Sequence, residues 1–128
     1  MMSDQRKNIG NLGENIAGRF LLEKGYKILA RNYRKPWGEI DIIAEQRGVV
    51  VFCEVKTNSK KFGLEFSPEL RVNREKVWQI TKTAKLFLQE RFPGKEMEWR
   101  IDVLSVIFDL VNKKAKIKHF LHAVGDSG

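Results

Sequence analysis

Hydrophobic and polar positions along the chain repeat with two periods, and each period predicts one type of element. Apolar residues recur at helical spacing over residues 9–24 and again over residues 73–91. Gly25 and Pro93-Gly94 are suited to end these two helices. Strand-like patterns cover the segments between and after them: residues 26–33, 38–45, 49–57, 99–110 and 116–123. The order α-β-β-β-α-β-β predicts an α/β domain, a mixed sheet of about five strands flanked by helices.

The second and third predicted strands have a register that follows from their apolar faces. If Arg47-Gly48 is a two-residue turn, Ile42 pairs with Cys53 on one face, and Asp41 pairs with Glu54 on the other. A slip of one residue would turn carboxylates into the core. The same register predicts three further pairs: Ile40 with Val55 and Ala44 with Val51 on the face of Ile42, and Glu39 with Lys56 on the face of Asp41. The expected loop after these strands covers residues 58–72.

The polar face of these two strands carries residue types that suit phosphodiester chemistry. Carboxylates placed one cross-strand pair apart repel each other unless a cation lies between them. Carboxylate oxygens suit Mg²⁺, which keeps several waters and binds substrate phosphate. Lys56 shares the face of Glu54 and is placed to orient a water or to neutralise phosphate charge. A solvated strand face with a Glu39–Lys56 ion pair is the alternative, although charges on such apolar strands usually need a partner or a metal.

Composition bounds the class of protein. The 128 residues, with a mass of 14.9 kDa, are expected to form one domain, with residues 1–8 and 125–128 as loose tails. One cysteine excludes an internal disulfide framework and a Cys-rich zinc site. No apolar run of about 18 residues or signal-peptide segment is present, so no membrane association and a cytoplasmic location are expected. The formal charge of +8 suggests a polyanionic partner.

Four segments carry a resemblance to a known family: residues 13–14, 38–43, 52–57 and 100–103. They resemble the motifs of the YraN-like proteins, small bacterial proteins predicted to have the PD-(D/E)XK, or restriction-endonuclease-like, fold. The resemblance covers residues 11–107, and the wider arrangement is similar to archaeal Holliday-junction resolvases. Two positions depart from the pattern: Asn58 stands where the family usually has Arg, and Ile40 where the superfamily has Pro.

The resemblance implies a role for each acidic residue of the candidate site. Asp41 and Glu54 would be metal ligands, Lys56 the catalytic lysine, and Glu14 a further acid beside the metal. The implied activity is a Mg²⁺- or Mn²⁺-dependent endonuclease acting on branched or structured DNA. Because such enzymes cut two strands, a homodimer is also implied, but no dimer surface follows from the sequence.

Basic residues bracket the acidic residues along the chain, and we expect them to bind the phosphates of a nucleic acid. A solvated surface is the alternative for each of them. The residues expected to bind nucleic acid are Arg31, Arg34, Lys35, Lys60, Lys61, Lys76 and Lys82.

Five other residues have structural interpretations. We expect Asp102 to pair with a nearby base, and Cys53 to be a buried small hydrophobe. His119 and His122 are expected to be ordinary sheet-edge residues instead of a metal pair, and Trp37 to pack at the core or its rim instead of stacking on a base. Two functions compete with a nuclease: a non-catalytic nucleic-acid-binding module, and an adaptor whose basic face binds an acidic protein.

Overall fold

The computed structural model describes residues 2–60, 74–109 and 111–123, and it confirms the predicted order of elements. The helices and strands are α1 Met2–Glu23, β1 Lys27–Lys35, β2 Gly38–Gln46, β3 Val49–Lys60, α2 Arg74–Arg91, β4 Glu98–Asp109 and β5 Lys114–Phe120. Helix α1 begins at Met2, so residues 2–8 are helical where the sequence favoured a loose tail. The tail expected at residues 125–128 and most of the loop expected at 58–72 lie outside the described residues.

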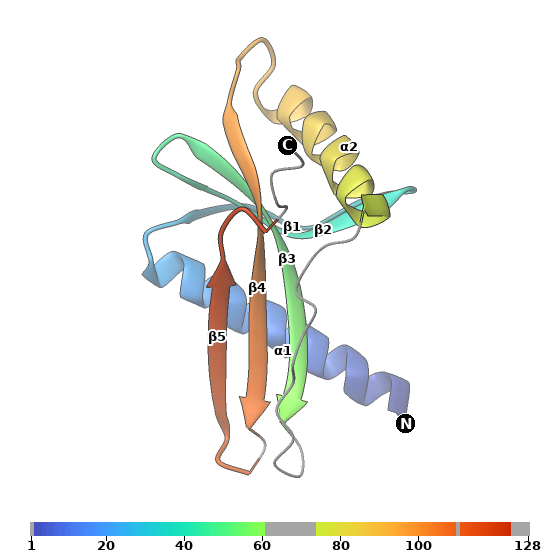
Figure 1. The fold of residues 1–128 in the computed structure, drawn as a ribbon, viewed down its shortest axis with the longest axis vertical. Helices are drawn as coiled ribbons and strands as arrows, with labels where there is room; N and C mark the ends of the chain where they lie inside the picture. The colour runs from blue at the N-terminus through green and yellow to red at the C-terminus, as the bar shows by residue number, and fades with distance from the viewer. Residues whose placement is uncertain (1, 61–73, 110, 124–128) are drawn as a thin grey trace.

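The five strands form one mixed sheet in the order β1-β2-β3-β4-β5. Neighbours are antiparallel except β3 and β4, which are parallel and are joined through α2. Figure 1 shows α1 crossing behind β3, β4 and β5, with α2 beside the β1–β2 hairpin. In the part of the chain that the structure describes, no helix is long and apolar enough to cross a membrane.

The core has two halves because alternate residues of β3 point to opposite faces of the sheet. Val51 and Cys53 lie in a cluster with Leu21 of α1, whereas Phe52 lies in a second cluster with Ile80 of α2. The side chains of all three strand residues are fully buried. The prediction that Cys53 is a buried hydrophobe is therefore confirmed, and β3 is the central strand of a three-layer domain.

Two local motifs confirm the expected ends of elements. At the end of α1, Gly25 has a φ of 92°, and Tyr26 N donates to Leu21 O at 2.9 Å. This is the Schellman arrangement, in which a left-handed glycine ends the helix. Between β2 and β3, Arg47 and Gly48 both have positive φ, at 52° and 80°. Such a type I′ turn matches the twist of a hairpin and fixes the predicted register, in which Ile42 pairs with Cys53.

Beyond Ile42 the predicted pairing is wrong, because β2 turns away from β3. Among the described residues the β2–β3 ladder ends at Ile42 and Cys53, so the expected Asp41–Glu54, Ile40–Val55 and Glu39–Lys56 pairs do not form. The β1–β2 ladder continues to Lys35 and Gly38. Figure 1 shows the consequence: the β1–β2 hairpin runs sideways while β3 runs down the sheet. We call this divergence at Asp41 and Val55 the fork.

The change of direction also reverses the face on which one isoleucine lies. Ile40 was expected to share the face of Ile42, but it lies in the α2-side cluster with Phe52. Opposite this bend, Asn32 of β1 has a φ of 52°, a left-handed conformation inside a strand. Because such a residue breaks the alternation of side chains, the two strands twist together and the hairpin leaves the plane of β3.

Helix α1 reaches the sheet through a glycine. A Cβ atom placed on Gly13 would lie 2.1 Å from Oγ1 of Thr57 on β3, well inside contact distance. No side chain larger than hydrogen fits there without movement of the helix. Since Glu14 follows Gly13 directly, this close approach sets how near Glu14 comes to the fork.

We predict that Gly13→Ala lowers the free energy of unfolding by about 1–3 kcal/mol, because the added methyl overpacks the α1–β3 contact. Urea denaturation followed by circular dichroism measures this change. Gly18→Ala is the matched control, since a Cβ on Gly18 meets nothing within 4 Å. The control is expected to gain about 0.5–1 kcal/mol from the helix propensity of alanine. Equal stabilisation by both changes would contradict the close approach.

Candidate functional site

Asp41 lies at the fork and takes the place of a missing backbone partner. Its Oδ2 accepts a hydrogen bond from Val55 N at 2.7 Å, which satisfies a backbone group that β2 no longer reaches. Burial raises the pKa of Asp41 to about 7, against the lowering effect of the Val55 hydrogen bond. Three neighbouring carboxylates, of Glu54, Glu14 and Glu39, raise the pKa further. Four acidic side chains are thus gathered at one point of the sheet.

Asn32 connects two of these acids. With its amide nitrogen turned toward the carboxylates, it donates to Glu14 Oε1 at 3.0 Å and to Glu39 Oε1 at 3.1 Å. Its left-handed backbone allows the side chain to reach both, and asparagine adopts that conformation more readily than most residues. The sequence interpretation missed Asn32 entirely and took Glu39 as a partner of Lys56. The available signal was an asparagine inside a predicted strand, a position where this residue type is uncommon.

Glu54 and Lys56 stand on β3 beside the fork, two residues apart and therefore on one face. The Glu54 side chain is only 13% exposed, and its Oε1 lies 3.6 Å from Lys76 Nζ of α2. Lys56 is half-buried. Helix α2 therefore supplies one wall of the site, as α1 supplies Glu14 on another.

Three of the cations expected to bind nucleic acid contact the acids of the site. Arg31 Nη2 lies 3.7 Å from Glu14 Oε1, and Arg34 Nη2 lies 3.2 Å from Glu39 Oε2. Lys76 is the third cation, and it contacts Glu54. These contacts partly neutralise three of the four carboxylates in the protein alone, so a ligand or cation that binds those three acids must compete with them.

The other expected nucleic-acid contacts are spread along the β1–β2 hairpin and α2. Lys35 Nζ lies 3.6 Å from Glu90 Oε2 near the end of α2. Lys82 contacts two indole rings that are described below. The side chains of Lys60 and Lys61 lie outside the described residues.

The donor set suits a hard divalent cation by its chemistry, but it is not assembled as a cage. Among residues 8–58, 74–109 and 111–123, no three His, Cys, Asp or Glu side chains are arranged to hold a metal ion. Mg²⁺ commonly takes one or two carboxylates and completes its shell with water and substrate phosphate. Asp41 and Glu54 are the residues that would hold such an ion, with Glu14 next to them.

Asp102 belongs to a separate buried network, which confirms that it pairs with a nearby base. Its carboxylate accepts from Arg100 Nε at 3.0 Å, from His122 N at 3.0 Å, and contacts His119 Nε2 at 2.7 Å. Arg100 also donates to the hydroxyl of Tyr26 at 2.9 Å. Although burial raises the pKa of Asp102, the bonds from His119, Arg100 and His122 lower it below the ordinary value. The His119 side chain and the His122 backbone therefore complete a network around one acid.

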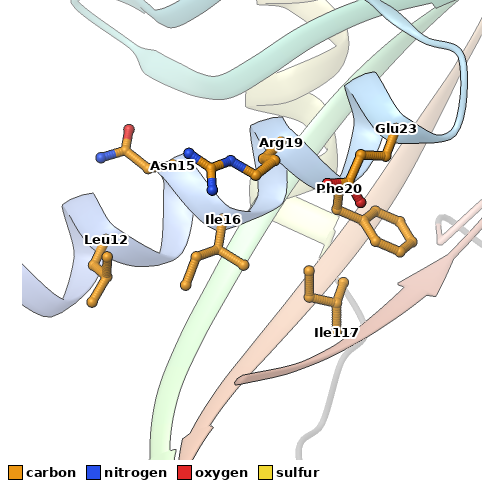
Figure 2. Close-up of a pocket in the computed structure, with 7 residues that line it drawn as sticks. All are labelled: Leu12, Asn15, Ile16, Arg19, Phe20, Glu23 and Ile117. Atoms are coloured by element: carbon orange, nitrogen blue, oxygen red, sulfur yellow. The ribbon is translucent and has the colours of Figure 1, made fainter. Parts of the chain in front are cut away.

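A shallow groove of about 370 Å³ lies beside α1 (Figure 2). It runs between α1 and β5, whereas Glu14 contacts Arg31 of β1 at the opposite edge of the sheet. Its walls are mainly apolar, with Arg19 and Glu23 as the charged members. The groove is therefore separate from the carboxylates. It is lined by Leu12, Asn15, Ile16, Arg19, Phe20, Glu23 and Ile117.

The fold and the fork thus define a small α/β protein with an acidic site between a strand and two helices. The profile of the uncharacterised protein family UPF0102 matches residues 13–106, a span that includes all four carboxylates and Lys56. The chain belongs to this family. The match confirms the resemblance to the YraN-like proteins at the level of the family.

Relatives in several bacteria match almost the whole chain. A UPF0102 protein of Clostridium botulinum is 40% identical over 113 residues, which are 88% of this chain and 89% of the relative. One of Caldicellulosiruptor bescii is 42% identical over 112 residues, which are 87% and 92% of the two chains. One of Desulforamulus reducens is 38% identical over 125 residues, which are 96% and 100%. These names describe a family and no activity.

We predict that Asp41→Asn stabilises the metal-free protein above neutral pH. The folded-state pKa is raised from 3.8 to about 7, so between these values the folded protein holds a proton that the unfolded chain has lost. Stability from this group therefore falls as the pH rises through that window. The neutral Asn avoids this loss while its Oδ1 still accepts from Val55 N. We expect a gain of about 1–3 kcal/mol at about pH 8 in EDTA and almost none at about pH 4.

Thermal and urea unfolding at the two pH values measure this difference. Glu98→Gln, an exposed acid at the start of β4, is the control and should show no pH-dependent gain. Saturating Mg²⁺ should stabilise the wild type at the higher pH more than the variant. A variant that is equally stable or less stable than the wild type at both pH values would contradict the raised pKa.

A second prediction concerns the buried network. Asp102→Asn removes the charge that pairs with Arg100 and His119, so we expect a loss of about 3 kcal/mol or more in the free energy of unfolding. Urea denaturation at neutral pH measures it, again with Glu98→Gln as the control on the same strand. Metal binding per folded molecule should be unchanged, because Asp102 lies outside the four-carboxylate cluster. A loss below about 0.5 kcal/mol would show that the network contributes little.

Proposed function

We propose that this protein is a metal-dependent nuclease of the restriction-endonuclease-like class, acting on branched or structured DNA. The observation that supports it is the position of Asp41. This partly buried acid lies among three other carboxylates, and its pKa is raised to about 7. Clusters of this kind, with strongly perturbed titration, are typical of functional sites. The negative charge costs stability in the protein alone and favours a bound cation.

Each residue at the fork has a distinct part in the proposed reaction. Asp41 and Glu54 would hold Mg²⁺ or Mn²⁺, with Glu14 as a further acid beside it. A bound ion of this type polarises a phosphoryl oxygen and lowers the pKa of a bound water. Lys56, on the same face as Glu54, would orient the attacking water or stabilise negative charge on the phosphate. Asn32 positions Glu14 and Glu39 through its two hydrogen bonds.

A nucleic-acid partner is supported by the charge of the chain. The formal net charge is +8, and several cations lie on the β1–β2 hairpin and α2. Phosphate contacts from such residues give affinity without sequence preference and with strong salt dependence. We also propose a cytoplasmic location and a homodimer, since cutting a branched substrate symmetrically needs two sites.

A non-catalytic nucleic-acid-binding module is the second candidate, and one observation favours it. Arg31, Arg34 and Lys76 already contact Glu14, Glu39 and Glu54 at 3.7, 3.2 and 3.6 Å. In such a module these ion pairs would be permanent. It would bind DNA without metal, and its binding would survive loss of Glu54.

Cleavage of labelled linear, flapped and four-way DNA, and of matched RNA, in Mg²⁺ or Mn²⁺ tests the proposal. We predict that the wild type cuts at least one substrate, and that Asp41→Asn, Glu54→Gln and Lys56→Met each lower the rate by at least about 100-fold. Glu98→Gln is the matched control and should keep the wild-type rate. Titration calorimetry with Mn²⁺ alone supplies a second readout, in which Asp41→Asn and Glu54→Gln lose binding.

The outcomes separate the two candidates. No cleavage by the wild type, or equal cleavage by the wild type and both acidic-site variants, would overturn the nuclease. Salt-dependent DNA binding that persists in EDTA and in Glu54→Gln, without cleavage, would establish the binding module instead.

A further inference from the structure

Two tryptophans and a lysine meet where the tip of the β1–β2 hairpin touches α2. Lys82 Nζ lies 4.3 Å from the ring centroid of Trp37 and 5.0 Å from that of Trp78. Trp37 precedes β2, and the other two residues lie one helical turn apart on α2. We call Trp37 and Trp78 the tryptophan pair. Figure 1 shows the start of α2 next to the hairpin tip.

The two indoles differ in how they are held. Trp37 is half-buried, and its Nε1 donates to Oγ1 of the fully buried Thr83 at 3.1 Å. A Cβ on the neighbouring Gly38 would lie 3.4 Å from the same Oγ1, so hairpin and helix are in close contact here. Trp78, by contrast, is 59% exposed. One ring is thus fixed to the core, and the other is largely exposed to solvent.

Exposure of an indole on this scale has no evident structural benefit. A cation–π contact at an exposed site contributes little to stability, and Trp78 belongs to neither core cluster. Exposed aromatic side chains beside a cation are the typical platform for unpaired nucleobases, because every base has a π face that stacks and a phosphate that the cation binds. Trp78 and Lys82 supply both groups, next to the fixed ring of Trp37.

The tryptophan pair lies close to the fork along the same strand. Trp37 and Asp41 are four positions apart in the sequence, a span of about 13 Å at the rise of a β-strand. This equals about four stacked nucleotides at 3.4 Å each. Helix α2 also connects the two places, since Lys76 contacts Glu54 two residues before Trp78.

We propose that the tryptophan pair binds an unpaired nucleotide, with the base stacked on Trp78 and its phosphate held by Lys82. The inference rests on the proposed function for its role: the substrate would carry a single-stranded segment a few nucleotides from the cleaved bond, as at a flap or a branch. Binding by the tryptophan pair needs no metal and no cleavage, so it is measured independently.

Anisotropy of a labelled single-stranded oligonucleotide of about 20 nucleotides, titrated with the full chain in EDTA, tests the proposal. We expect Trp78→Ala to raise Kd about 10-fold and Trp78→Phe to raise it less than about 3-fold, because phenylalanine still stacks. For the matching duplex, Trp78→Ala should change Kd by less than about 2-fold. Leu22→Ala is the control, since Leu22 of α1 is also 59% exposed.

Tryptophan fluorescence of the wild type should be quenched by the oligonucleotide and not by polyglutamate. An equal Kd for the wild type and Trp78→Ala, an equal increase in Leu22→Ala, or the same quenching by polyglutamate would overturn the inference. Lost binding in Trp78→Ala with no cleavage by any variant would support the tryptophan pair and refute the nuclease. Cleavage that depends on Asp41, with unchanged single-strand binding in Trp78→Ala, would support the nuclease and refute binding by the tryptophan pair.

Discussion

The hydrogen bond from Val55 N to Asp41 Oδ2 is the contact on which the candidate site depends. It exists because β2 leaves β3 after the Ile42–Cys53 pair, so the backbone N–H of Val55 on β3 needs another acceptor. A carboxylate supplies that acceptor and is thereby held in a poorly solvated place. The same geometry that satisfies the backbone therefore raises the pKa of Asp41 and brings it among Glu54, Glu14 and Glu39.

Two close approaches of helix to sheet bring the remaining groups to this point. Gly13 lets α1 lie against Thr57, which places Glu14 near the fork, and Gly38 lets α2 lie against the start of β2. Glycine is needed in the first position because the space that a side chain would fill is already occupied. The site is thus a meeting of three layers, and its geometry depends on packing as much as on the acids themselves.

The net charge of +8 does not show how the basic residues are distributed. Arg31, Arg34 and Lys76 are in contact with carboxylates of the site, so part of the basic surface already compensates local negative charge. A metal that binds the carboxylates would displace these cations, and the released cations could then contact a phosphate. Binding of the metal and binding of the phosphate are coupled in this way. Lys82 lies apart, between two indoles, and its environment is suited to an aromatic ligand with a negative charge.

The sequence by itself determined the elements, their order, and the register set by the Arg47-Gly48 turn, because apolar periodicity and turn chemistry act over short distances. It also indicated Asp41, Glu54 and Lys56 as a group, since alternation along adjacent strands brings such residues to one face. Only the tertiary structure decided that the ladder stops at Ile42 and that Asn32 links Glu14 to Glu39. It also decided that Ile40 changes face. These features depend on the left-handed bend of β1 and on helix contacts across the sheet, which join residues far apart in the chain and leave no periodic trace in it.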